Sequence, residues 1–142
     1  MQRPPRSAFD FEFDTGPVLL GMALQLVVAI PVLFVVGDWL LVLLTAVIAG
    51  GVASARGDFY AQAANNGFLA ALLGVCCLFP FLFVRHFGLF QPGGETGDSV
   101  LYATLFSSAE LLALAPAAAI LGYVSASVIA IGRRKRRARN SG

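Results

Sequence analysis

Charged side chains are scarce in this 142-residue chain, at 13% of the residues, and lysine, histidine and tryptophan occur once each. Soluble domains average about 25% charged residues. With 58% hydrophobic residues, the chain lacks the polar side chains that a soluble surface of this size requires. The composition therefore excludes an ordinary soluble domain and predicts a protein that lies in a membrane.

Residues that carry out catalysis or bind metals are also few. Cys76 and Cys77 are adjacent inside an apolar stretch, where they are poorly placed for a disulfide or a metal site and serve as small apolar side chains. His86 has no serine or cysteine partner in a recognisable motif, and no glycine-rich phosphate loop follows a strand. We therefore expect no enzymatic activity, no metal and no cofactor.

Long apolar stretches dominate what remains. Most are long enough to cross a hydrocarbon core of about 30 Å as a helix, and the second is shorter but is extended by Trp39 and the flanking turn. We predict an all-α polytopic membrane protein with four transmembrane helices. The predicted spans are residues 17–37, 39–55, 67–86 and 108–132, with a tight turn at Gly37 and Asp38 between the first two. Pro31, Pro80 and Pro116 lie inside these spans and predict kinks.

The last apolar stretch, Val100 to Ile131, would reach about 48 Å as one helix and exceeds a simple span. Ser107 and Glu110 have the spacing of a capping box, in which the serine caps a new helix and the glutamate reaches back to it. We therefore expect a helix start near residue 108. Residues 100–106 then either form a short interfacial piece or belong to the fourth span, and the sequence does not decide between these two alternatives.

Positive charge gathers at the C-terminal end, where six cationic side chains lie between Arg133 and Arg139. Basic residues are retained on the cytoplasmic side of a membrane. With four spans, this side collects nine of the ten basic residues, and only Arg85 lies outside. The charges therefore predict that both termini are inside, with residues 133–142 as a basic cytoplasmic tail.

Small residues recur at steps of four in three of the predicted spans, which lets helix backbones approach closely. This face serves either as a dimer contact, with self or another membrane protein, or as packing inside one bundle, and we favour the bundle. The predicted helix-packing residues are Ala46, Gly50, Ser54, Ala70, Gly74, Ala118, Gly122, Ala126 and Ala130.

Ionisable residues within membrane spans are candidates for function. Arg85, His86 and Glu110 fall near the outer end of their predicted helices, so they form a candidate outer-face polar cluster that could gate a small channel or transporter subunit. The simpler alternative makes Glu110 a helix cap and Arg85 an interfacial anchor that extends its charge toward water. We favour this alternative because no chain of polar groups crosses the middle of the spans.

The basic tail has three interpretations: retention and orientation, contact with anionic lipid headgroups, and contact with nucleic acid. Retention requires nothing beyond the charges themselves and is favoured. The residues available for lipid or nucleic-acid contact are Arg133, Arg134, Lys135, Arg136, Arg137 and Arg139.

Residues 1–16 form an acidic and aromatic N-terminal arm, in which Asp10, Glu12 and Asp14 alternate with phenylalanines. The arm shares the predicted inner side with the basic tail, so a contact between the two is one interpretation. The favoured interpretation is a mobile acidic arm.

The segments Ala49 to Gly57 and Gly67 to Gly74 resemble small, uncharacterised four-span membrane proteins of halophilic archaea. In these, a Gly/Ala-rich helix ends at a short polar loop and a Gly-Xaa-Leu-Ala-Xaa-Leu-Xaa-Gly-like segment starts the next. The arginine-rich composition also fits a GC-rich genome, such as those of halophilic archaea and actinobacteria. In size and inward-facing tail the chain is similar to small internal membrane proteins of pleomorphic haloarchaeal viruses. The resemblance implies four spans and no activity.

Together these features predict a non-enzymatic, multi-pass protein of the cell membrane, or alternatively of a virion membrane, with a structural or assembly role. One alternative function is a small channel or transporter subunit. Another is a membrane tether that holds nucleic acid through the arginine-rich tail. The expected partners are the lipid bilayer, self or another membrane protein through the small-residue faces, and, less favoured, nucleic acid.

Overall fold

The computed structural model of the chain describes residues 12–56, 60–91 and 95–140. Every regular element in these ranges is helical, which confirms the predicted all-α class. The elements are α1 (Thr15–Pro31), the π-helical η1 (Val32–Val36), α2 (Trp39–Ala53), the 3-10 segment η2 (Ser54–Arg56), α3 (Tyr60–Cys76), α4 (Phe79–Phe90) and α5 (Thr96–Asn140).

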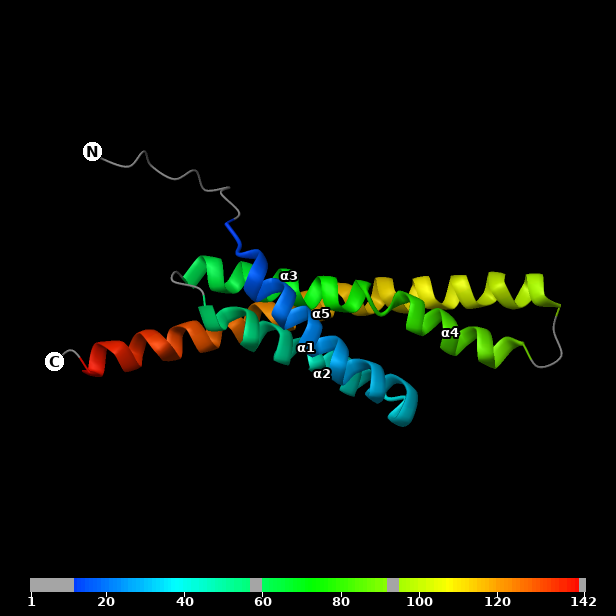
Figure 1. Cartoon of the computed structure of the whole chain (residues 1–142), viewed down its shortest axis with the longest axis horizontal. Helices are drawn as coiled ribbons and strands as arrows, with labels where there is room; N and C mark the ends of the chain where they lie inside the picture. The colour runs from blue at the N-terminus through cyan, green and yellow to red at the C-terminus, as the bar shows by residue number, and fades with distance from the viewer. Residues whose placement is uncertain (1–11, 57–59, 92–94, 141–142) are drawn as a thin grey trace.

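The helices run back and forth along the long axis of the molecule (Figure 1). We call the end that holds both termini the terminal end. From this end α1 leads away and α2 returns; α3 and α4 together then lead away again, and α5 returns. The α1–α2 and α4–α5 turns lie toward the opposite end, here the loop end. There the two pairs diverge, and α4 and α5 extend further than α1 and α2.

Aspartates start the first two helices. The Asp14 carboxylate accepts a hydrogen bond from the Gly16 amide, and the Asp38 carboxylate accepts from the Leu40 and Leu41 amides. Each carboxylate therefore satisfies backbone donors that have no partner inside the helix. Between the helices, Gly37 has a φ of 70°, which glycine adopts without steric cost. The predicted turn at Gly37 and Asp38 is confirmed.

Irregular backbone accompanies two of the three prolines that predict kinks. Pro31 ends α1, and the π-helical turn that follows closes with a bond from the Gly37 amide to the Val32 carbonyl. Pro80 lies in the first turn of α4, directly after a break at Cys77 and Leu78. Proline has no N–H to continue the helical ladder, so the chain makes a turn and starts a new helix. Pro116, by contrast, lies inside α5, which continues through it.

The third apolar stretch is longer than predicted. The helical region begins at Tyr60 rather than residue 67 and reaches Phe90, with the Cys77–Leu78 turn between α3 and α4. The segment before Gly67 is helical because one of its faces is buried at the terminal end of the molecule. Ala63, Ala64 and Asn66 are buried there.

The predicted helix start near residue 108 is wrong, because α5 is continuous from Thr96 to Asn140. Ser107 does not act as a cap: it is fully buried, and its hydroxyl has no hydrogen-bond partner among the described residues. Ser99, Ala103 and Ser107 are small, buried and spaced four residues apart. Such spacing puts them on one face of the helix, along which α5 and α4 pack. Residues 100–106 are therefore part of the same helix and not a separate piece.

Small residues bring α2, α3 and α5 into backbone contact. A Cβ built on Gly50 of α2 would lie closer than 3.0 Å to the Gly122 carbonyl oxygen of α5, and one built on Gly67 of α3 would meet the same atom. A Cβ on Gly122 would in turn meet the Gly67 carbonyl oxygen. Real Cβ atoms essentially never approach so closely, so each of these positions requires glycine.

Most of the predicted helix-packing residues are buried between helices of the chain. Eight are buried and Ala130 is half-buried; the eight are Ala46, Gly50, Ser54, Ala70, Gly74, Ala118, Gly122 and Ala126. Helices of the same chain therefore occupy these faces, which agrees with packing inside one bundle.

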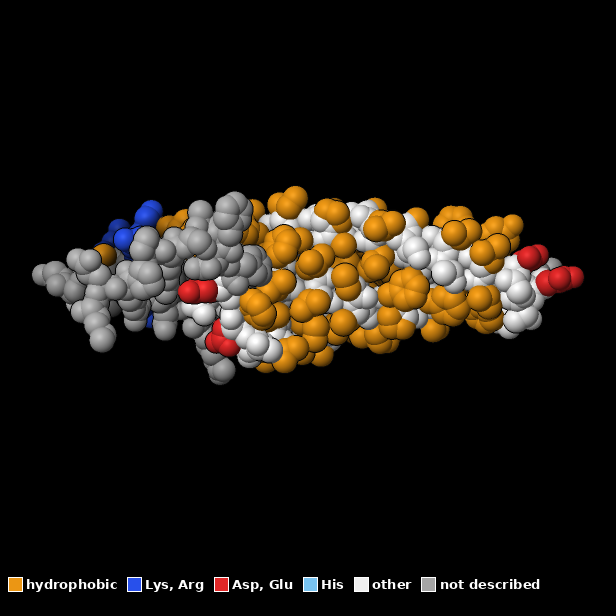
Figure 2. All heavy atoms as spheres, turned by 90° about the horizontal axis from the view of Figure 1, so that it is seen from above, with side chains coloured by type: hydrophobic (Ala, Val, Ile, Leu, Met, Phe, Trp, Pro, Cys, Tyr) orange, Lys and Arg blue, Asp and Glu red, His pale blue; other side chains and the backbone are white. Residues whose placement is uncertain are grey.

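Three helical segments are long and apolar enough to cross a membrane: Thr15–Val36, Tyr60–Phe90 and Thr96–Asn140. The helix Trp39–Ala53, predicted as the second span, is apolar but shorter. On the face shown in Figure 2, hydrophobic side chains form a wide band between the two ends of the molecule, which carry the charged side chains. This distribution is that of a membrane protein.

Candidate functional site

Two of the three residues of the predicted polar cluster meet at the contact between α4 and α5. His86 Nε2 lies 2.7 Å from Glu110 Oε2, a distance at which the imidazole N–H donates a hydrogen bond to the carboxylate. The His86 side chain is 9% exposed and the Glu110 side chain 25%. The pair thus joins two helices in a largely buried contact, where a satisfied polar group is stabilising and an orphaned one is costly.

Aromatic rings surround this pair. The His86 ring lies 5.9 Å from the Phe106 ring and 6.3 Å from the Phe90 ring, centroid to centroid. Phe90 also contacts Phe106 at 5.3 Å and Tyr102 at 5.7 Å. These residues are spaced four apart on each helix, so their rings project from facing sides and interlock. The pair and the rings together hold the α4–α5 hairpin closed.

Arg85, the third predicted member, faces a different helix. Its guanidinium lies 5.1 Å from the centre of the Trp39 ring, which is a cation–π distance. It also approaches the turn before α2, because a Cβ on Gly37 would lie 3.4 Å from Arg85 Nη2. Arg85 therefore links the α1–α2 hairpin to α4, and the structure does not bring it into one cluster with His86 and Glu110.

The basic tail is helical through Asn140 as the last turns of α5. Arg133 Nη1 donates a hydrogen bond of 2.8 Å to the Ala55 carbonyl oxygen in η2, directly after α2. Carbonyls at a helix C-terminus lack partners within the helix, and a cation there is favourable. This contact fixes the start of the tail against the bundle. Arg134, Lys135, Arg136, Arg137 and Arg139 follow and are exposed.

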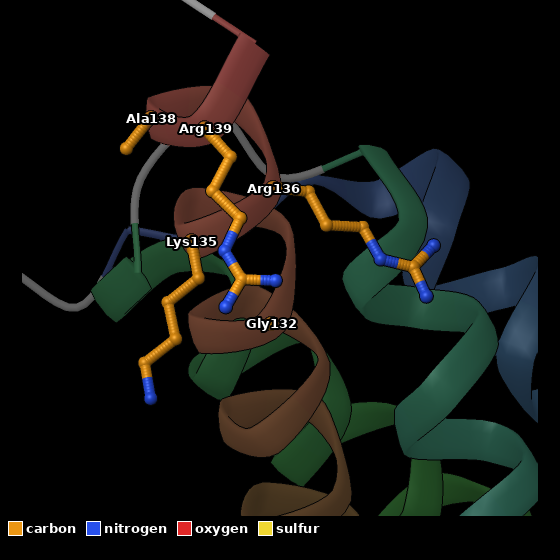
Figure 3. Close-up of a pocket in the computed structure, with 5 residues that line it drawn as sticks. All are labelled: Gly132, Lys135, Arg136, Ala138 and Arg139. Atoms are coloured by element: carbon orange, nitrogen blue, oxygen red, sulfur yellow. The ribbon is translucent and has the colours of Figure 1, made fainter. Parts of the chain in front are cut away.

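A pocket of about 380 Å³ lies on the tail, lined by Gly132, Lys135, Arg136, Ala138 and Arg139. Figure 3 shows the side chains of Lys135 and Arg139 pointing back along α5 toward Gly132, while Arg136 extends toward a neighbouring helix. A Cβ on Gly132 would meet nothing within 4 Å, so no other part of the described chain covers this surface of α5. Lys135 and Arg139 therefore place two cationic groups on this side of α5, and Arg136 lines the edge of the pocket.

The described part of the N-terminal arm is held by asparagines of α3. The Asp14 amide donates to Asn66 Oδ1 at 2.8 Å, and Asn65 Nδ2 donates to the Glu12 carbonyl oxygen at 3.1 Å. This contact was not predicted from the sequence, although two adjacent asparagines at the start of an apolar helix were its available signal. The predicted contact between the arm and the basic tail falls partly on Asp10, which lies outside the described residues.

Gln25 is a second buried polar residue whose surroundings the sequence does not reveal. Its side chain is fully buried and fills the space over Gly74, where a Cβ would meet its amide group. Neither Oε1 nor Nε2 has a hydrogen-bond partner among the described residues. A buried amide without a partner is destabilising, and only a residue as small as Gly74 leaves room for it between α1 and α3.

In the ranges 12–56, 60–91 and 95–140, no group of three or more His, Cys, Asp or Glu side chains is arranged to hold a metal ion. Cys76 and Cys77 are free thiols on the exposed surface. No protein-family model, curated protein or solved structure matches the chain.

The contact between His86 and Glu110 predicts an energetic coupling between α4 and α5. We expect Glu110→Gln and His86→Gln each to lower the free energy of unfolding by about 1–2 kcal/mol, because each leaves a weaker or unsatisfied partner in a half-buried contact. In a double-mutant cycle, measured by denaturant unfolding of the detergent-solubilised protein, the coupling energy should be about 1 kcal/mol.

The matched control is Glu95→Gln, which removes an exposed carboxylate from the other end of the same hairpin and should change stability by less than about 0.5 kcal/mol. A coupling energy within about 0.3 kcal/mol of zero, which is the error expected of additive sites, would show that the two side chains do not act together.

Proposed function

We propose that this chain is a non-enzymatic, multi-pass integral membrane protein with a structural or assembly role. One observation carries the proposal: α2, α3 and α5 meet backbone to backbone at Gly50, Gly67 and Gly122. The space between these helices is filled by main chain and by buried alanines such as Ala46, Ala71 and Ala118. This close packing at the helix crossing supports a role that depends on shape and surfaces, because transport requires a polar path between the helices.

The proposal includes four membrane crossings with both termini on the inner side. α1 and η1 together have 22 residues and reach about 33 Å. α2 and η2 reach about 28 Å from Trp39 to Arg56, so this pair also approaches the thickness of a hydrocarbon core. On α5, the distance along the helix from Glu110 to Arg133 is about 35 Å. Glu110 and Arg133 thus lie about one membrane thickness apart.

Cysteine labelling tests this topology. In a Cys76→Ser, Cys77→Ser background, we expect Glu95→Cys to react with a membrane-impermeant maleimide in intact cells, and Asn140→Cys to react only after lysis, because the basic tail is retained on the cytoplasmic side. Both positions are exposed in the structure. Labelling of Asn140→Cys in intact cells would refute the orientation, and labelling of neither or both positions would refute the four crossings.

A small channel or transporter subunit is the second candidate, and the half-buried pair of His86 and Glu110 is the observation that favours it. In the proposed role this pair is a helix contact and conducts nothing. Proteoliposomes that contain the wild-type protein or Glu110→Gln should therefore show the same proton and monovalent-cation flux as protein-free liposomes. Flux above this baseline from the wild-type protein would contradict the proposed role, and its loss in Glu110→Gln would establish the channel function.

A further inference from the structure

We propose that the pocket at Gly132, Lys135, Arg136 and Arg139 binds the headgroup of an anionic phospholipid. The inference goes beyond the structural role proposed above. It requires only that α5 lies in a membrane and depends neither on the number of crossings nor on the absence of transport.

The first argument is the continuity of one helix face. Val124, Val128 and Ile131 are 50%, 63% and 45% exposed, and they precede Lys135 and Arg139 at steps of three or four residues along α5. Residues at this spacing lie above one another on one side of a helix. An exposed apolar ridge therefore runs directly into the cationic pocket, and a lipid matches both parts, with its acyl chain along the ridge and its phosphate in the pocket.

The second argument is the position of the pocket relative to the headgroup region of the membrane. The apolar segment of α5 ends at Ile131, and the headgroup region that follows is roughly 5–7 Å deep on each side of a bilayer. Lys135 lies three residues beyond Gly132, or about 4.5 Å along the axis. Side chains on a helix lean toward its N-terminus, and Figure 3 shows those of Lys135 and Arg139 returning toward Gly132. Their cationic groups therefore reach the layer where phospholipid phosphates lie.

The third argument is charge complementarity. Lys135 and Arg139 place their cationic groups on the pocket side of the helix, and Arg136 lines the edge of the pocket; residues 124–139 contain no aspartate or glutamate. Arg133 is engaged with the Ala55 carbonyl, so it fixes the tail rather than the ligand. An arginine also donates two parallel hydrogen bonds to a phosphate, and the net positive charge of the pocket favours an anionic headgroup over a zwitterionic one, whose own cation compensates its phosphate.

The positions of the charges provide a matched control. At 3.6 residues per turn, Arg134 and Arg137 lie on the side of the helix away from Lys135 and Arg139. Two double variants therefore remove the same net charge from the same segment: Lys135→Gln/Arg139→Gln and Arg134→Gln/Arg137→Gln. Only the first pair removes the pocket.

The test is native mass spectrometry of the full chain in detergent, titrated with dioleoylphosphatidylglycerol or with phosphatidylcholine of the same acyl chains. We expect tighter binding of phosphatidylglycerol to the wild-type protein. The Lys135/Arg139 variant should lose about 10- to 30-fold in affinity, since a charge near the surface contributes on the order of 1 kcal/mol. The Arg134/Arg137 variant should stay within about threefold of wild type. Unchanged gel-filtration elution of both variants confirms that they are folded.

Three results would overturn the proposal. Equal losses in the two variants would show that the tail attracts lipid only by its net charge. Displacement of phosphatidylglycerol by an equal concentration of glycerol 1-phosphate would show a site for small phosphates that makes no use of the apolar ridge. Displacement by a single-stranded oligonucleotide at physiological salt, with the same dependence on Lys135 and Arg139, would assign the pocket to nucleic acid.

Discussion

The backbone contact among α2, α3 and α5 is the constraint on which the rest of the structure depends. Gly50, Gly67 and Gly122 bring three helices within a distance that a single methyl group would prevent. Lipid supplies no hydrophobic force between helices, so close van der Waals packing is what associates them. Buried alanines extend this contact toward α1 through Ala49, Ala53 and Ala70. The register of the bundle is therefore set by its smallest side chains.

Polar contacts lie on either side of this helix crossing, toward the two ends of the molecule. Each of them joins segments that are distant in the sequence. At the terminal end, Arg133 holds the end of α2 and Asn66 holds the amide of Asp14. Toward the loop end, Arg85 covers Trp39, and His86 pairs with Glu110. The ends are therefore where charge can act on lipid or on a partner, while the centre supplies rigidity. This division supports a structural role with a lipid-binding end.

Local sequence patterns predicted the helical class, the small-residue faces and the turn at Gly37, because each depends on composition and short-range geometry. The capping box at Ser107 failed for a physical reason: Ser99, Ala103 and Ser107 together form a small-residue face for α4, and this tertiary packing outweighs a local cap. The partners of His86 and Arg85 and the burial of Gln25 over Gly74 could not be predicted, because each depends on how distant helices cross. The resemblance to haloarchaeal membrane proteins stays a prediction.

The measurement that tests the central claim most directly compares glycine-to-alanine substitutions at and away from the helix crossing. Gly88 of α4 has nothing within 4 Å of its added methyl group, so Gly88→Ala should raise the free energy of unfolding by about 0.5–1 kcal/mol through helix propensity. Gly122→Ala has the same propensity gain but forces α3 away, and should lower the free energy of unfolding by about 1–3 kcal/mol, independently of protein concentration. Equal stability of the two variants, or a loss in Gly122→Ala that changes with protein concentration, would contradict packing within a single chain.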